Sequence, residues 1–395
     1  MTDFTMVIPT YWGGSGDQLI KNEKIVFDHP TPLDKKGTLP SLLDSLDILS
    51  EIAKVKIAVI TVPNEPGISK AVSDKVEEII APYQSRYDIV SLDIFILEKI
   101  EKELRKNGVS LEALDLINLE NYAAVRNMCS LAGILNGTQC TVFIDDDEVF
   151  IDPNFLVKII EDLEHPVQGE TIDALAGYYL QPDTYYLDEK KVPAWRLPYW
   201  NNTKAMNQAL DRFIGTTPRL KPVPFVFGGN MILTLSTLMK VPFDPRITRG
   251  EDIDFLLNLR VNGITFFLDR ELSVKHLPPV TKRPAWKGVR EDAMRFMYER
   301  KKVIDHLELS LEDLKPYPGI FLGPDLVERI IKTNELLMDE YESGGDDDGV
   351  TECRANIAMA ENDPFKNVDT REWLKKLTAW WREVTSCAKN MGIPG

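Results

Sequence analysis

The sequence predicts an α/β protein with a mixed central sheet flanked by helices and a helical extension at its C-terminus. Up to about residue 285, short apolar runs bounded by proline or glycine alternate with helical patterns, and beyond it only helical spacing remains. The chain has 395 residues, of which 44% are hydrophobic, so it is long enough to bury a large core.

The N-terminal part reads as a β-α-β unit. The apolar runs 5–9 and 56–62 each stop at a proline, and a helical pattern spans Leu39 to Ile52 between them. Residues 11–37 form a long insertion directly after the first strand, which we expect to be an extra flap.

A second helical pattern, from Glu120 to Leu135, ends at Asn136-Gly137, a typical left-handed helix stop. The apolar run Cys140 to Ile144 follows immediately and predicts a strand. Asp145 is then expected at the carboxyl end of that strand, where ligands bind in open α/β sheets.

The pattern after residue 170 is mixed. Residues 172–179 are strand-like, 204–214 helix-like, and 224–233 apolar with a break at Gly228-Gly229. Parallel and antiparallel strands are therefore expected to share one sheet.

The predicted organisation is a sheet-containing domain over residues 1–284 and a helical extension over 285–395. The segment 342–349, rich in glycine and aspartate without an apolar anchor, is expected to be a mobile acidic loop.

Composition excludes several classes of function. The net charge of -16 would repel nucleic acid, and no apolar run reaches the ~20 residues that a bilayer requires. The four cysteines form no C-x-x-C pair, which favours reduced thiols and a cytoplasmic location. If the chain forms a homo-oligomer, the C-terminal helices are the expected contact.

The acidic cluster Asp145, Asp146 and Asp147 predicts a divalent cation site. A hard cation such as Mn²⁺ or Mg²⁺ with oxygen ligands offsets concentrated negative charge, and the alternate carboxylates of Asp145 and Asp147 can converge. The alternative is a solvated turn that caps the helix beginning near Pro153.

Two further positions carry candidate chemistry. Glu251 and Asp252 begin a helical pattern closed by Asn262-Gly263, and a carboxylate there can accept a proton from a hydroxyl. Compensation of the helix dipole is the simpler interpretation of the same pair. His276 ends a strand-like segment and is either a structural histidine or a ligand for a manganese-class ion.

Taken in order, these motifs resemble those of GT-A-fold nucleotide-sugar glycosyltransferases, especially the inverting group called family 2. The likeness extends over about residues 5–279. It implies that residues 1–284 are a catalytic domain, with a nucleotide-binding half over about 1–150 and an acceptor-binding half over about 151–284. Its pieces are Val-Ile-Pro-Thr at 7–10, Ala-Ala-Val-Arg-Asn at 123–127, Phe-Ile-Asp-Asp-Asp at 143–147, Gly-Gly-Asn at 228–230, Gly-Glu-Asp at 250–252 and Val-Lys-His at 274–276.

The resemblance implies a role for each matching residue. Pro9 and Thr10 would line the nucleotide, Arg126 would contact nucleotide or diphosphate, and Asp146 would lie on the nucleotide side. The D-x-D pair would be Asp145 and Asp147, with His276 as a further metal or diphosphate contact, and Asp252 would be the general base with Glu251 beside it. The chain departs from the family after the second strand, where Asn64 replaces the usual acidic turn that reads the base.

The implied reaction is transfer from a nucleoside diphosphate sugar to the hydroxyl of a saccharide or small-molecule acceptor, with inversion. A retaining transferase, a nucleotidyltransferase and a non-catalytic sugar-nucleotide-binding protein are the alternatives. Fold-level likeness identifies neither the sugar nor the acceptor.

Overall fold

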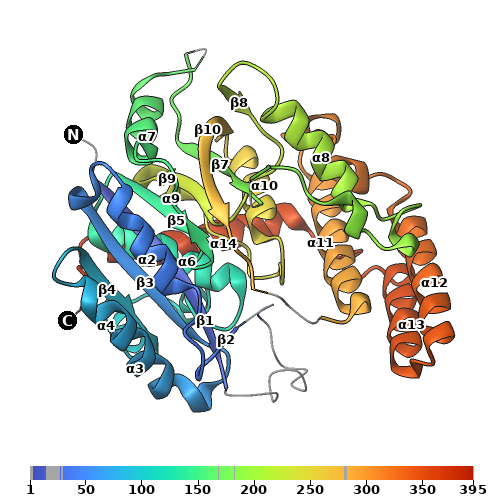
Figure 1. The fold of residues 1–395 in the computed structure, drawn as a ribbon, viewed down its shortest axis with the longest axis horizontal. Coiled ribbons are helices and arrows are strands. Elements are labelled where there is room, and N and C mark those ends of the chain that lie inside the picture. The colour runs from blue at the N-terminus through green and yellow to red at the C-terminus, as the bar shows by residue number, and fades with distance from the viewer. Residues whose placement is uncertain are drawn as a thin grey trace.

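The computed structural model describes residues 3–14, 27, 30–167, 169–181, 183–279 and 283–394. Within these ranges, ten strands form one sheet in the order β4-β3-β1-β5-β9-β7-β10-β6, with β2 beside β1 and β8 beside β10 (Figure 1). The strands are β1 (Phe4–Gly13), β2 (Thr31–Pro32), β3 (Val55–Pro63), β4 (Asp88–Leu92), β5 (Cys140–Ile144), β6 (Glu148–Val149), β7 (Ala174–Leu180), β8 (Leu220–Pro222), β9 (Asn230–Thr234) and β10 (Phe266–His276).

Helices cover both faces of this sheet because its central strands are apolar on both sides. In β1, Val7 packs into one core, whereas Met6 and Ile8 pack into the other. The described α-helices are α2 (Leu39–Ser45), α3 (Ser69–Ile80), α4 (Ile94–Lys106), α5 (Leu111–Leu114), α6 (Tyr122–Asn136), α7 (Phe155–Glu164), α8 (Asn202–Phe213), α9 (Leu235–Lys240), α10 (Glu251–Val261), α11 (Ala285–Asp305), α12 (Leu326–Gly344), α13 (Asp347–Glu361) and α14 (Thr370–Ala388). The predicted class, a mixed α/β sheet with a helical C-terminal extension, is confirmed.

Strand directions bring the predicted motifs to one edge of the sheet. Strands β4, β3, β1 and β5 are parallel, and β9 runs antiparallel to both β5 and β7. Since β7 and β10 are parallel, they point the same way as β5. The carboxyl ends of β1, β5, β7 and β10 therefore meet the amino end of β9.

Several local predictions are confirmed by the backbone. Helix α6 ends at Gly137 with φ 65°, and α10 lies between Gly250, with φ 76°, and Asn262. The helix expected over 39–52 is shorter, because α2 stops at Ser45 and 3-10 turns follow. Strand β1 is longer than expected and continues past Pro9 to Gly13.

The acidic segment 342–349 is not a loop. It contains the end of α12, a turn at Gly345-Asp346 and the start of α13. Gly345 adopts φ 70° as the C-cap of α12, and the Asp346 side chain caps α13 by accepting from the N–H of Gly349 at 2.8 Å. Gly349 itself packs beneath the Tyr341 ring. This contact holds the segment in place without an apolar side chain of its own.

The helical extension is joined to the sheet domain by a buried ionic cluster. The Lys302 ammonium on α11 donates to Asp254 on α10 at 2.7 and 2.9 Å and to Asp244 at 3.1 Å, and Lys302 is 1% exposed. The indole N–H of Trp373 on α14 also donates to Asp244, at 3.0 Å. Removing either side would leave buried charge uncompensated.

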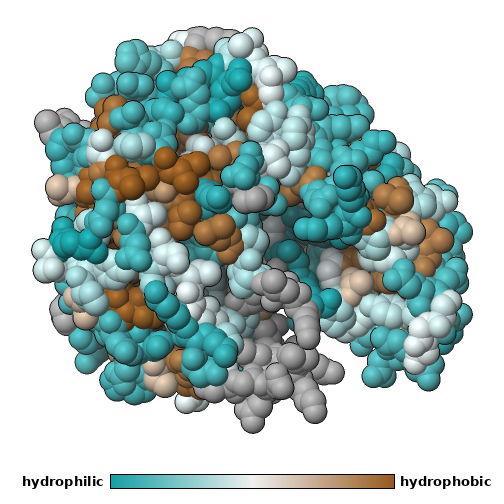
Figure 2. Space-filling view, viewed as in Figure 1, coloured by the Kyte–Doolittle hydropathy of each residue, from teal (hydrophilic) through white to brown (hydrophobic). Residues whose placement is uncertain are grey.

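In Figure 1, α11, α12 and α13 form the right-hand lobe, and α14 runs back to the left beneath the sheet. The face in Figure 2 is mostly hydrophilic and is hollowed between the sheet domain and this lobe. No helix in the described part of the chain is long and apolar enough to span a membrane.

Candidate active site

A cavity of about 310 Å³ lies at the edge of the sheet where the strand ends meet. Its walls come from the carboxyl ends of β1, β5, β7 and β10 and from the amino ends of α6 and α10. The lining includes seven of the ten residues predicted to form the site, namely Arg126, Asp145, Asp146, Asp147, Glu251, Asp252 and His276. Motifs more than 100 residues apart in the sequence thus meet in one place.

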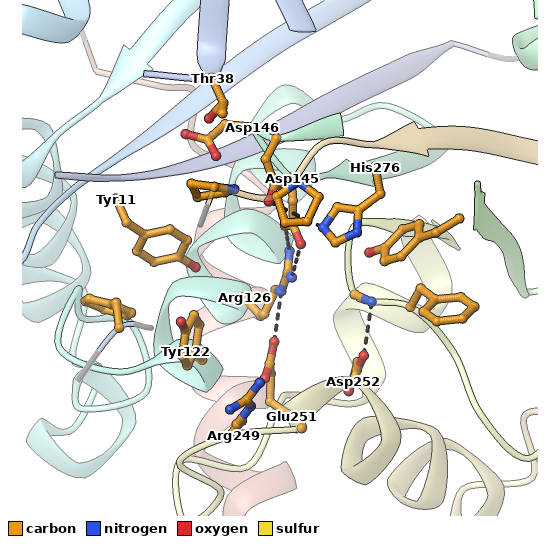
Figure 3. A pocket seen from close by; sticks show the side chains of 18 of the residues that line it. Tyr11, Thr38, Tyr122, Arg126, Asp145, Asp146, Arg249, Glu251, Asp252 and His276 are labelled. Atoms are coloured by element: carbon orange, nitrogen blue, oxygen red, sulfur yellow. Dashed lines mark hydrogen bonds and ion pairs between the residues drawn. The ribbon is translucent and has the colours of Figure 1, made fainter. Parts of the chain in front are cut away.

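Arg126 is the central cation of the cavity. Its guanidinium donates to both carboxylate oxygens of Asp145, at 2.8 and 3.1 Å, and its Nε donates to Glu251 at 3.2 Å (Figure 3). Burial alone would lower the pKa of Arg126, which is 4% exposed, but the two carboxylates outweigh burial and raise it well above its ordinary value. Burial raises the pKa of Glu251, and Arg126 opposes that rise.

The position of Arg126 explains the first glycine of the Gly228-Gly229 pair. A Cβ atom at Gly228 would lie 2.6 Å from Nη2 of Arg126. Only a residue without a side chain lets this loop close over the guanidinium. The sequence predicted a break in the strand here, and the break makes room for the ion pair.

Asp146 points to the other side of the strand end, toward β1. Its carboxylate accepts from the Thr10 hydroxyl at 2.6 Å, and that hydroxyl accepts from the Trp12 indole N–H at 2.9 Å. Burial raises the pKa of Asp146 to about 7, against the opposing hydrogen bonds from Thr10 and Thr38. Asp146 is therefore only partly ionised near neutrality.

Asp147 and His276 form the candidate metal pair. Oδ2 of Asp147 lies 3.4 Å from Nε2 of His276, and the imidazole stacks on the Tyr179 ring with 4.8 Å between centroids. Among the described residues, no three His, Cys, Asp or Glu side chains come together closely enough to hold a metal unaided. Asp145, also expected as a ligand, accepts two hydrogen bonds from Arg126.

The residues present nevertheless fit a cation of the Mn²⁺ or Mg²⁺ class. Such ions commonly take one or two protein ligands and complete their coordination with phosphate oxygens and water. Asp147 and His276, which both line the cavity, would supply an oxygen and a nitrogen ligand.

Glu148 is a neighbour of this cluster that sequence reasoning missed. It is 1% exposed, and its Oε2 accepts from the N–H of Asp145 at 3.1 Å. Burial raises its pKa well above the ordinary value, and the charges of Asp145 and Asp147 add to that rise. A Cβ at Gly229 would overlap Oε1 of Glu148, which accounts for the second glycine of the pair. The run of four acidic residues at 145–148 was the sequence signal that could have identified Glu148 as part of the cluster.

Asp252 lies in the wall of the cavity opposite Tyr11 and Tyr122, with Arg126 between them (Figure 3). Its Oδ2 accepts from the N–H of Gly228 at 3.1 Å and its Oδ1 from the N–H of Ile253 at 2.8 Å. These bonds fix the direction of the carboxylate, while burial raises its pKa.

Three predicted contacts do not line the cavity. Pro9 lies inside the sheet opposite Ile60, and Thr10 lies beneath Asp146. The backbone N–H of Asn64, at the end of β3, donates to Trp12 at 2.8 Å, and its carboxamide makes no hydrogen bond within the described residues.

Aromatic side chains line the part of the cavity that Pro9 and Thr10 were expected to line. The rings of Tyr11, Phe27 and Tyr122 line the cavity, with centroids 4.5 to 5.5 Å apart. The sequence did not indicate this aromatic wall, since its members come from three separate segments. Of the insertion at 11–37, residues 15–26 and 28–29, including His29, lie outside the described residues.

No protein-family model and no curated protein sequence match this chain. Among solved structures, it is similar to a mannosyltransferase from Pyrobaculum calidifontis in complex with GDP-Man and Mn²⁺, at 12% identity over 98% of this chain and 88% of that chain, with a TM-score of 0.48. It is also similar to glucosyl-3-phosphoglycerate synthase from Mycobacterium tuberculosis in complex with Mg²⁺ and uridine diphosphate, at 15% identity over 75% and 78% of the two chains and a TM-score of 0.38. A third is mouse xyloside xylosyltransferase 1, at 13% identity over 65% and 76% and a TM-score of 0.31. At these identities the likeness concerns the fold and does not extend to substrates.

Proposed function

We propose that this protein transfers a sugar from a nucleoside diphosphate sugar to an acceptor hydroxyl, with a divalent cation as cofactor. The supporting observation is the single cavity that gathers the acidic cluster, Arg126, His276 and the Glu251-Asp252 helix start. The candidate metal pair of Asp147 and His276 alone would suit many reactions. Its combination with a fixed carboxylate across the same cavity suits displacement at a carbon between the two.

The donor would lie with its base toward the aromatic wall of Tyr11, Phe27 and Tyr122 and its diphosphate toward Asp147 and His276. Aromatic faces suit a planar base, and the cavity floor between them holds Arg126. When bound, the divalent cation would offset the charge that develops on the departing diphosphate. Asn64, whose carboxamide is unpartnered within the described residues, remains our candidate for a contact to the base or ribose.

Asp252 is proposed as the general base. Its carboxylate accepts the proton of the acceptor hydroxyl as the acceptor oxygen bonds to the anomeric carbon. The bond from that carbon to the diphosphate breaks at the same time, and its electron pair leaves on the diphosphate oxygen. One displacement of this kind inverts the anomeric centre. Glu251 is held by Arg126 and does not compete for the proton.

The first test is a thermal-shift panel of nucleoside diphosphate sugars, with and without MnCl₂. A donor that binds only the folded state raises the melting temperature, and the proposal requires a rise that depends on both nucleotide sugar and Mn²⁺. A panel with no such rise would speak against the donor class. Arg86→Gln, which changes an exposed arginine far from the cavity, is the control and should bind as the wild type does.

The second test identifies the stereochemistry with the donor selected by that panel. Proton NMR of the product is expected to show inversion, and Asp252→Asn is expected to abolish turnover while donor binding persists. Retention at the anomeric carbon, or near-normal turnover by D252N, would remove Asp252 from the role of base.

A further inference from the structure

Helix α11 of the C-terminal extension places Arg295 in the cavity, although the sequence marked this region only as an appendage. Arg295 lines the cavity and is 8% exposed. Its Nη2 donates to the Tyr317 hydroxyl at 2.7 Å and lies 3.5 Å from Asp292, which fixes the plane of the guanidinium. No motif in the resemblance covers this residue.

The guanidinium packs directly against the turn that leads into Glu251 and Asp252. Gly250 at this turn has φ 76°, and a Cβ on it would overlap Cδ and Nη1 of Arg295. A left-handed backbone and the lack of space both require glycine here. Arg295 and the start of α10 are thus built as a close-fitting pair.

The charges around Asp252 come from three helices and from the turn before α10, where Arg249 lines the cavity and lies 3.7 Å from Glu291 on α11. Arg126 on α6 is already shared between Asp145 and Glu251, and Glu251 is the acid next to Asp252 on α10. Helix α11 contributes Arg295 and Glu299. After burial, which raises the pKa of Asp252, Arg295 is the strongest influence and lowers it, ahead of Arg126.

Glu299 does not compete for the charge of Arg295 at neutral pH. It is 0% exposed, its Oε1 lies 3.9 Å from Nε of Arg295, and neither carboxylate oxygen has a hydrogen-bond partner within the described residues. Burial raises the pKa of Glu299 to about 8, so the acid is mostly protonated at pH 7. The positive charge of Arg295 is then shared by Asp292, which lies 3.5 Å from Nη2, and by Asp252.

We propose that Arg295 is a positioning residue for Asp252, which holds the Gly250 turn in place and supplies the counter-charge of the carboxylate. The helical extension therefore completes the active site and is more than an appendage. This inference rests on the proposed role of Asp252 as the base.

The test is Arg295→Gln, measured as the pH profile of kcat and KM. Arg295 lowers the pKa of Asp252, so its removal is expected to move the acid limb of kcat up in R295Q, by about one pH unit, the lower end of the range for a neighbouring opposite charge. KM for the donor should change little. Arg295→Lys, which keeps the charge, should restore most of the shift, because a structural defect alone would not respond to charge.

Arg290→Gln is the matched control. Arg290 is an arginine of the same helix, but it binds Asn356 and Glu352 on α13 at 2.5 Å each and does not line the cavity. R290Q is expected to keep the wild-type acid limb. If R295Q does not fold, Tyr317→Phe releases the guanidinium without removing its charge and should give a smaller shift in the same direction. An unmoved acid limb in R295Q, or in Y317F if R295Q does not fold, overturns the proposal.

The Asp252 carboxyl can also be titrated without substrate, by carbon NMR of carboxyl-labelled protein with D252N for assignment. An upward shift of its pKa in R295Q is expected even if no donor is ever found. The result separates the two ideas, since absence of any transfer activity refutes the function, whereas an unshifted Asp252 titration refutes the role of Arg295.

Discussion

Replacing Arg126 by glutamine should cost the protein a large part of its stability. The side chain is 4% exposed and makes three hydrogen bonds to two carboxylates, at 2.8, 3.1 and 3.2 Å. Removing one partner of a buried ion pair typically costs about 3–5 kcal/mol, because the remaining charge stays buried without compensation. Folded proteins have only about 5–15 kcal/mol of stability to lose.

The loss should depend on pH in a defined direction. Burial already raises the pKa of Glu251 above its unfolded value, and without the guanidinium that pKa rises further. A carboxyl whose folded pKa is raised stabilises the fold below its unfolded pKa, and this contribution is lost as pH rises through the folded pKa. The deficit of R126Q is therefore expected to be smaller at pH 5 than at pH 8.

Urea unfolding followed by circular dichroism at both pH values measures the effect. Arg86→Gln is a suitable control, because Arg86 also contacts both oxygens of an aspartate, at 2.8 and 2.6 Å, but on the exposed surface. The control should unfold like the wild type. A loss below about 1 kcal/mol for R126Q, or equal losses at pH 5 and pH 8, would refute the view of Arg126 as the counter-charge of buried acids.

Three further substitutions and the pH dependence of the melting temperature have defined outcomes. Gly250→Ala should lower the unfolding free energy by about 1–3 kcal/mol, since a left-handed alanine is strained and its Cβ meets Arg295, and an unchanged urea midpoint would contradict this. His276→Ala should weaken Mn²⁺ binding by at least about tenfold in a spin-resonance titration, and unaltered affinity would remove His276 from the ligand set. The raised pKa values of Asp146, about 7, and Glu299, about 8, contribute stability that is lost as pH rises through those values, so the melting temperature should fall from pH 6 to pH 9. Glu299→Gln should flatten the upper part of that fall, and a slope identical to the wild type would show that Glu299 is not its source.

The parts of the fold that the sequence predicted well are those with local signals. The end of α6 at Gly137 and the delivery of Asp145 by β5 both follow from a glycine stop and an apolar run within a few residues. The acidic turn at 345–346 carried a local signal as well, a glycine followed by a capping aspartate, but its lack of apolar residues suggested a loop.

The parts that could not be predicted depend on contacts between distant segments. Nothing near Arg126 in the sequence indicates that it will bind Glu251, 125 positions away. The register of β1 against β3, which extends the strand to Trp12 and places Thr10 under Asp146, is set by the whole sheet. Arg295 reaches the cavity only because α11 packs against α10.

The buried cluster around Lys302 affects how this protein could be recombined with others. A chimera that joins a foreign C-terminal segment after β10 would leave Asp244 and Asp254 buried without their lysine, and no adjustment of surface residues compensates for that. The α12–α13 hairpin can be exchanged without touching this cluster. A chimera would have to keep helices α11 and α14 together with the sheet. The suitable fusion boundary therefore lies inside the extension and not at its beginning.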